Sequence, residues 1–238
     1  MAMTLLELLR EFTDRRNLTR PEIVMASSDE TVSQLRALAN EVISDLTSRG
    51  RSWAALQKEA TFVSAAAQSQ GLLATIAPYG FKYVVPDTLF DRTDRRPLYG
   101  PRNAADWQQS QAIVQTGPFY SYRIWGSEFY LQPAPPAGHT IVFEYASDMA
   151  IKAEDGTWRK RFFADTDTFA LDEDVLLSGL NWKWRREQGL SYTQEKMDYE
   201  AMLTQLAGTE STRGAISLSG GSSDIKPGFF VPSGNWPV

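Results

Sequence analysis

Hydrophobic residues recur at helical spacing in the first fifty positions of the chain. One stripe predicts a short helix over residues 3–13 and consists of Leu5, Leu8, Leu9 and Phe12. A second stripe predicts a helix over residues 28–48 and consists of Val32, Leu35, Leu38, Val42 and Leu46. Ser27 and Glu30 have the spacing of a capping box at the start of this helix, and Gly50 is a stop signal after it.

From residue 53 the pattern changes to short runs of β-branched and aromatic residues bounded by Gly and Pro, which predict strands. These runs cover residues 60–64, 81–86, 119–125, 128–132 and 140–145, and a short helix over 103–112 interrupts them. Gly126-Ser127 suits a type II′ hairpin turn. Another hairpin is expected across Glu154-Asp155-Gly156, which joins 149–153 to 157–162. Such strands predict an antiparallel sandwich or small barrel.

Helical spacing returns at Asp172, an N-cap candidate that is followed by acidic residues in the first turn. The apolar stripe of this helix consists of Val175, Leu176, Leu180 and Trp184. Gly189 ends it, and Ser191 with Gln194 forms a second capping-box pattern, from which another helix continues to Gly208. A connection this short makes the two helices antiparallel neighbours.

The segment 211–238 has a different composition. Ser, Gly or Pro make up 14 of its 28 residues, so no regular element is expected. It nevertheless carries large apolar side chains, namely Ile225, Phe229, Phe230, Val231 and Trp236. Because such side chains need burial against the subunit or a partner, we interpret the segment as an extended arm with a binding role.

The order of the elements predicts an α+β fold. The helices at each end of the chain leave an apolar stripe uncovered, and a bundle built from both ends buries both stripes. The expected division is residues 1–50 for the N-terminal helices of the bundle and 51–168 for an inserted antiparallel β domain. Residues 169–210 form the C-terminal helical hairpin of the bundle, and 211–238 form the extended C-terminal arm.

Composition excludes several kinds of chemistry. The chain has no cysteine, which excludes disulfides, thiolate metal sites and cysteine nucleophiles. Its single histidine, His139, excludes metal motifs that need two, and its Pro-rich turn predicts a solvated side chain without a catalytic role. No glycine-rich phosphate-binding motif occurs. We therefore expect neither an enzyme nor a bound cofactor or metal.

The charge balance disfavours a protein that grips nucleic acid. With 24 basic and 29 acidic residues the formal net charge is −5, whereas phosphate neutralisation needs a basic face. No apolar run reaches the ~18–20 residues of a transmembrane helix. The N-terminal stretch has the pattern of an amphipathic helix and not of a signal peptide, so no membrane partner is expected.

A local cluster of arginines consists of Arg92, Arg95, Arg96 and Arg102, and Asp91 and Asp94 offset two of these charges. Such a loop either contacts nucleic acid or makes ion pairs at a protein interface. We favour a subunit interface, since arginine is enriched at protein contacts. On the predicted strand 157–162, Arg159 and Arg161 share one face, which is either solvated or directed at DNA or a protein partner. Trp182, Trp184 and Tyr192 are interpreted as packing residues in the core or between subunits.

Two other functions are open from the residues alone. A β-sandwich module that binds carbohydrate would use exposed aromatic side chains such as Tyr120, Trp125 and Tyr130. A hydrolase would use a carboxylate pair such as Asp165 and Asp167. The run 165–172 also resembles the start of a calcium loop, but it lacks the required Gly and the last Glu, so we interpret it as an acidic helix-capping loop.

A series of motifs resembles the head-to-tail adaptor proteins of tailed bacteriophages, especially short-tailed ones. The motifs occur in the order 53–62, 86–92, 98–101, 122–126 and 129–135, followed by the helical hairpin from 169–177 through 182–185 to 199–201. The similarity covers about residues 30–208. These motifs are structural, and no catalytic residue comes with them.

The resemblance implies a virion protein that is synthesised in the host cytoplasm and works by assembly. Such adaptors form a twelve-subunit ring beneath the portal vertex and extend the channel through which the genomic DNA passes. The tail nozzle and tail fibre proteins attach below. The helical bundle builds the ring, the β part projects outward or toward the tail, and the C-terminal arm reaches the portal protein.

Overall fold

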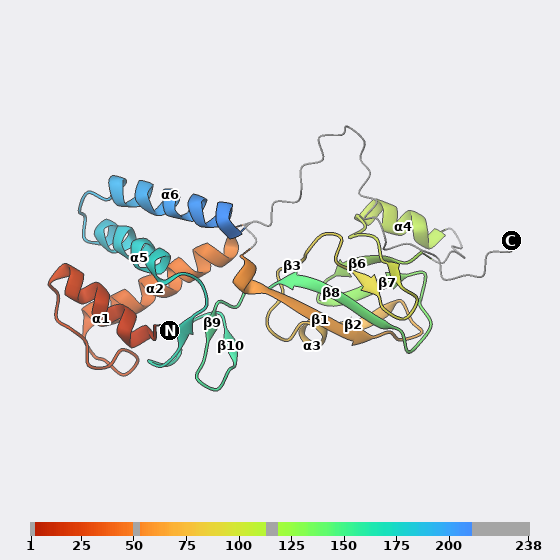
Figure 1. The fold of residues 1–238 in the computed structure, drawn as a ribbon, viewed down its shortest axis with the longest axis horizontal. Helices are drawn as coiled ribbons and strands as arrows, with labels where there is room; N and C mark the ends of the chain where they lie inside the picture. Colours follow the sequence, from red (N-terminus) through yellow and green to blue (C-terminus); the bar gives the residue numbers. More distant parts are fainter. Residues whose placement is uncertain (1–2, 50–52, 113–118, 211–238) are drawn as a thin grey trace, which may run out of the picture.

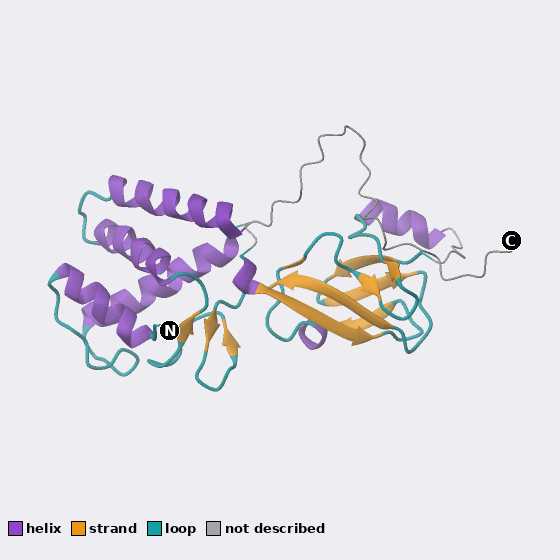
Figure 2. Cartoon of the chain, in the orientation of Figure 1, coloured by secondary structure: helices purple, strands orange, loops and turns teal. Residues whose placement is uncertain are grey.

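The protein has two units that lie end to end along its longest axis (Figure 1). The computed structural model describes residues 3–49, 53–112 and 119–210. Helices dominate one unit and strands the other, which confirms the predicted α+β class (Figure 2). The predicted arm, 211–238, lies outside the described residues. Among the helices that are described, none has the length and apolarity needed to cross a membrane.

Helices from both ends of the chain form the first unit. They are α1 (Leu5–Arg16), α2 (Glu30–Ser48), α5 (Glu173–Glu187) and α6 (Thr193–Glu210). The apolar stripes that predict these helices meet in a single core. α5 contacts each of the other three, so the bundle is closed by a helix that follows the β strands in the chain.

The start of α1 agrees with its sequence, and its end does not. Thr4 and Glu7 form a reciprocal capping box at the start. The helix continues to Arg16 instead of ending at residue 13, because Asn17 adopts the left-handed conformation that closes a helix.

The predicted capping boxes of the other helices are wrong. Asp29 and not Ser27 caps α2, since Asp29 Oδ1 accepts from the Thr31 N–H at 2.7 Å. A carboxylate is the better acceptor at the positive end of a helix. At the start of α6, Gln194 donates forward to Asp198 at 2.8 Å and does not reach back to Ser191.

Two antiparallel sheets form the second unit around a shared core. The first has the order β1-β8-β4-β5, with β3 also paired to β8, and the second has the order β2-β7-β6. The strands are β1 (Gln57–Val63), β2 (Ser69–Leu72), β3 (Tyr83–Val84), β4 (Phe90–Asp91), β5 (Arg96–Pro97), β6 (Ser121–Trp125), β7 (Glu128–Gln132) and β8 (Thr140–Ala146). Short helices flank them, namely η1 (Ala54–Leu56), α3 (Leu73–Ile76) and α4 (Ala104–Ala112).

Both predicted hairpins are present. Strands β6 and β7 pair up to the Gly126-Ser127 turn, where Gly126 has a φ of 61°, as a type II′ turn requires. β9 (Ile151–Lys152) and β10 (Trp158–Arg159) pair across the second turn, and β11 (Thr168–Phe169) joins the other side of β9.

The strand predicted over 157–162 is shorter than expected, so its predicted alternation is wrong. It ends at Arg159, and Phe162 turns into the helical core, where its N–H donates to Asn40 Oδ1 at 2.9 Å. Ile151 and Phe169 are buried in the same core. The small sheet therefore packs with the helices, although the expected β domain extends to residue 168.

The chain enters and leaves the β unit at neighbouring positions. The Ser147 N–H donates to the Leu56 carbonyl at 2.8 Å, beside the first pair of the β1–β8 ladder. Lys82 connects the two units, because its Nζ donates to the carbonyls of Thr47 and Arg49 at the end of α2. Burial lowers the pKa of Lys82.

Gly179 allows the closest helix contacts of the bundle. A Cβ at this position would lie 2.6 Å from Val42 Cγ1 on α2 and 3.0 Å from Tyr199 Cε2 on α6. The absence of a side chain on α5 therefore permits two neighbouring helices to approach it at the same level.

We expect Gly179→Ala to lower the free energy of unfolding by about 1–3 kcal/mol in urea titrations followed by circular dichroism, because the new methyl overpacks the core. Gly208→Ala on α6 is the matched control, since nothing lies within 4 Å of its Cβ position. It should be neutral or stabilising by up to about 1 kcal/mol. An unchanged midpoint for Gly179→Ala would contradict the close packing.

Candidate interaction surfaces

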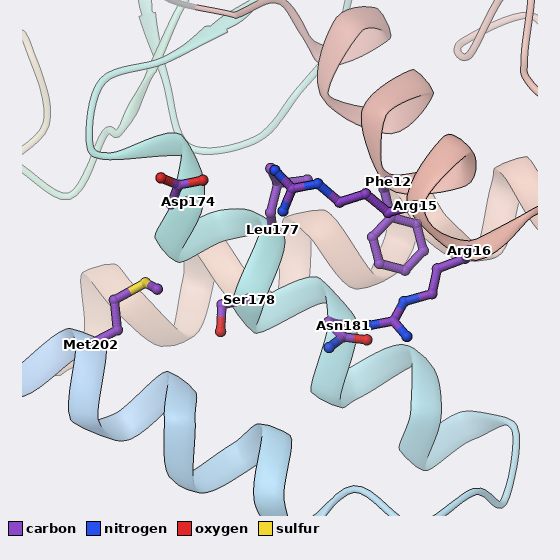
Figure 3. Close-up of a pocket in the computed structure, with 8 residues that line it drawn as sticks. All are labelled: Phe12, Arg15, Arg16, Asp174, Leu177, Ser178, Asn181 and Met202. Atoms are coloured by element: carbon purple, nitrogen blue, oxygen red, sulfur yellow. The ribbon is translucent and has the colours of Figure 1, made fainter.

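A groove between α1, α5 and α6 gathers polar side chains that have few internal partners (Figure 3). It has a volume of ≈ 220 Å³, and Phe12 and Leu177 form part of its apolar wall. Arg15 pairs with Glu11 on its own helix. Within the described part of the chain, Arg16 has no acidic partner and Asn181 Oδ1 is buried without a donor. These groups suit a polar contact with another protein.

The predicted arginine cluster lies on the β unit, around β4 and β5. Arg92 pairs with Glu59 on β1 at 3.2 Å, whereas Asp91 and Asp94 lie beside His139. Arg95 and Arg96 are exposed, and in the described ranges neither has an acidic partner. Arg102 follows the same loop, and its N–H donates to the Tyr122 carbonyl at 2.9 Å. The loop thus presents Arg95 and Arg96 as cations that no acidic side chain in the described ranges neutralises.

His139 is not solvated, which corrects the expectation from its turn. Its side chain is 14% exposed, and Nδ1 lies 2.8 Å from Asp91 Oδ2 and 3.9 Å from Asp94 Oδ2. These three side chains have the ligand types of a divalent-cation site. Asp91 is fully buried, however, and its other oxygen already accepts the N–H groups of Thr93 and Asp94. We therefore interpret the cluster as a set of hydrogen bonds that holds this loop in place.

The carboxylates proposed for a hydrolase hold the backbone in place. Asp165 accepts from the N–H groups of Val24 and Met25 at 3.0 and 2.8 Å, which fastens the α1–α2 connection to the loop before α5. Asp167 is fully buried and accepts from the N–H groups of Phe163 and Ala164 at 2.7 and 2.9 Å. Groups whose lone pairs are used in this way are poorly suited to acid–base catalysis.

Arg159 also serves this loop. Its guanidinium lies 3.3 Å from Asp167 Oδ1, so it is neither a solvated nor a partner-facing residue of a regular strand face. Arg161, which was expected to share its face, is exposed.

An aromatic row covers part of the outer face of the β2-β7-β6 sheet. Trp107 of α4, Tyr130 of β7 and Trp125 of β6 follow one another with ring centroids 6.4 and 6.1 Å apart. The guanidinium of Arg123 lies 5.5 Å from the Trp125 ring, and Trp125 is 60% exposed. Tyr120 is not part of the row, since it packs against the core of the unit. Exposed Trp, Tyr and Arg together are typical of protein contact surfaces.

Hydrogen bonds fix the polar end of this row. Glu128 Oε2 accepts from Ser69 Oγ and from Tyr130 Oη, each at 2.8 Å. These two bonds lower the pKa of Glu128, and the same carboxylate raises the pKa of Tyr130. The row therefore carries a fixed negative charge beside its aromatic rings.

The tryptophans of the helical hairpin pack inside the bundle. Trp182 is buried between Tyr192 and Tyr199, with ring centroids 6.3 and 6.2 Å away. Trp184 meets Phe12 of α1 edge-on at 6.1 Å. They have the core role proposed for them and do not form a ligand pocket.

The match to known families accounts for a molecule that presents several contact surfaces. The family model described as SU10 adaptor protein matches residues 3–221. The chain belongs to the SU10 adaptor protein family. It is a phage adaptor protein, and the predicted resemblance to head-to-tail adaptors is confirmed at that level. A search of the curated proteins finds no match.

The adaptor's contact surfaces differ in how far its sequence reveals them. The arginine cluster is contiguous in the chain and is found by inspection. The groove brings together Arg16 and Asn181, and the aromatic row brings together Trp107 and Tyr130. These residues are far apart in the sequence and meet only in the folded protein. One signal for the row is the spacing of Arg123 and Trp125, which places both side chains on the same face of β6.

The role of Asp167 in holding the loop before α5 can be tested by mutation. We expect Asp167→Ala to lower the free energy of unfolding by about 2–4 kcal/mol in urea titrations, because two part-buried N–H groups lose their acceptor at roughly 1–2 kcal/mol each. Glu154→Ala, on the exposed hairpin tip, is the matched control and should be neutral. Wild-type stability for Asp167→Ala would show that the carboxylate is not needed for the fold.

Proposed function

We propose that the adaptor forms a ring between the portal and the tail of a phage virion. The resemblance described above supports a ring of twelve subunits in a short-tailed phage. The observation that carries the proposal is the family match over residues 3–221. The end-to-end arrangement of a helical unit and a β unit supports it, because it gives the adaptor separate surfaces for lateral and axial contacts (Figure 1).

Ring closure requires a head-to-tail interface in which two different faces of the same subunit meet. The cations of Arg95, Arg96 and Arg102, together with Arg92, supply one such face. On a chain with a net charge of −5, acidic side chains can supply the complementary face. We assign these arginines to the contact between neighbouring subunits.

The charge of the chain suits a channel for genomic DNA. Twelve copies at −5 each carry about −60, and an acidic lumen repels the duplex and limits its sticking. Passage is then independent of DNA sequence. This role needs no cofactor and no catalytic side chain.

The axial partners in this proposal are the portal protein and the tail nozzle or tail fibre proteins. We assign the arm to the portal, because its apolar residues stand between Gly, Ser and Pro residues and can insert into a groove. These residues are Ile225, Phe229, Phe230, Val231 and Trp236, all outside the described ranges. The aromatic row on the β unit supports a second contact, with a tail protein.

We expect that deleting residues 222–238 leaves the melting temperature of the adaptor nearly unchanged and abolishes its capture by immobilised portal protein of the same phage. Phe230→Ala with Trp236→Ala should weaken capture in the same way, because the apolar anchors are lost. Ser233→Ala is the control. Full capture by the deletion variant would disprove the role of the arm.

We expect Arg96→Glu to reduce ring assembly on the portal, and to do so more strongly at low ionic strength, because it reverses a charge at the subunit contact. Negative-stain microscopy and sedimentation measure the rings. Arg20→Glu, an exposed arginine on the helical unit, is the matched control. Equal ring yields for the two variants would remove the arginine loop from the interface.

A further inference from the structure

Strand β1 lies at the edge of its sheet. It has seven residues and pairs antiparallel with β8 along its whole length, from Gln57 opposite Ala146 to Val63 opposite Thr140. The strand order β1-β8-β4-β5 leaves its other side without a strand neighbour among the described residues. Seven residues is long for an edge strand, since protein edges are usually kept short.

The hydrogen-bonding direction of each β1 residue follows from the ends of the ladder. Leu56 and Ser64 both bond toward β8, the first to the Ser147 N–H and the second to the His139 carbonyl, each at 2.8 Å. Because the direction alternates along an antiparallel strand, the even-numbered residues face β8. The N–H and C=O groups of Glu59, Thr61 and Val63 therefore point to the open side.

Few of the usual edge protections are present on this part of β1. It contains no proline, and its register with β8 runs without a bulge. Lys58 Nζ lies 3.9 Å from the centre of the Trp158 ring. The small sheet that packs with the helices therefore shields only the beginning of the strand. Val63 is 67% exposed, and Phe62 on the core face is only partly buried. An added strand would complete both the ladder and this margin of the core.

The chain carries a suitable segment soon after α6. Residues 215–219 read Ala-Ile-Ser-Leu-Ser, an alternation of apolar and polar side chains that is typical of a half-buried strand. The family match extends to residue 221 and so includes this segment, although it stops before the aromatic residues of the arm. Gly220-Gly221-Ser222-Ser223 then separates the two parts, so each can bind independently.

The position of α6 brings this segment within reach of β1. Glu200 Oε2 lies 2.7 Å from Arg49 Nη1, which holds α6 against the end of α2, and this hydrogen bond raises the pKa of Arg49. α6 then ends on the side of the bundle that faces the β unit (Figure 1). The link over residues 211–214 spans up to about 17 Å when extended.

We propose that residues 215–219 add to the open edge of β1 of the same chain as an extra strand. Ile216 and Leu218 then lie on the core face beside Phe62. Ser217 and Ser219 share the solvent face with Thr61. The pairing goes beyond the portal contact assigned to residues 225–236 and does not depend on it.

Disulfide trapping tests the pairing, because the chain has no cysteine of its own. Thr61→Cys is combined in turn with cysteine at 216, 217, 218 and 219, and the full-length protein is oxidised at low concentration. We expect crosslinks within one chain for Ser217→Cys and Ser219→Cys, and little for Ile216→Cys and Leu218→Cys, as strand alternation requires. Thr157→Cys, on an exposed hairpin turn, replaces Thr61→Cys in the control and should give none.

Three results of this experiment would overturn the proposal. Crosslinks between two chains would identify a second copy as the occupant, equal yields at all four positions would indicate random collisions, and a lack of crosslinks would leave the edge without this strand. Portal capture is measured separately, so a failure of the strand pairing and a failure of the portal contact can be told apart.

Amide hydrogen exchange gives a second readout without cysteine. In the variant that lacks residues 211–238, the amides of Glu59, Thr61 and Val63 should exchange about tenfold or more faster than in the full chain. Those of Ala60 and Phe62, which bond to β8, should change little. Leu218→Pro should reproduce the effect and Ser223→Pro should not, because position 218 lies within the added strand and position 223 lies beyond it. Unchanged exchange at the three open-side amides would contradict the pairing.

Discussion

The fold depends on the burial of one apolar stripe from the start of the chain against another from its end. α2 and α5 are separated by the whole β unit in sequence, yet they contact directly, and Gly179 permits the approach. Among the described elements, α5 is the helix that packs along α2. The N-terminal helices therefore cannot complete their core until the C-terminal hairpin has been added.

Charged side chains serve this packing more than they serve chemistry. Asp165 and Asp167 hold loops against the bundle through backbone N–H groups, and Asp91 with His139 does the same at the far end of the β unit. Lys183 is buried on α5 and pairs with Glu41 of α2 at 2.7 Å. A buried charge is tolerated where such partners satisfy it. What is left for contacts with other proteins is the arginine loop, the groove beside Arg16 and the aromatic row.

The helices and the longer strands could be predicted from the sequence because their signals are local. Periodicity located α1, α2, α5 and α6, and the Gly126 turn located one hairpin. Short pairings such as β4 with β5 have no such signal, since each is formed by two residues and is held by the strands around it. The wrong capping residues reflect competition between neighbouring acceptors, which only the backbone geometry decides. The partner of His139 is likewise 48 residues away in sequence, so no local pattern reveals it.

The adjacent entry and exit of the β unit have an evolutionary consequence. Since Leu56 and Ser147 are hydrogen-bonded neighbours, the β unit is an insertion whose two ends meet at one point of the helical unit. Its strands can diverge, lengthen or be exchanged while the helices keep their connectivity. A lineage could then exchange that one module for another, and the helical half would be inherited intact.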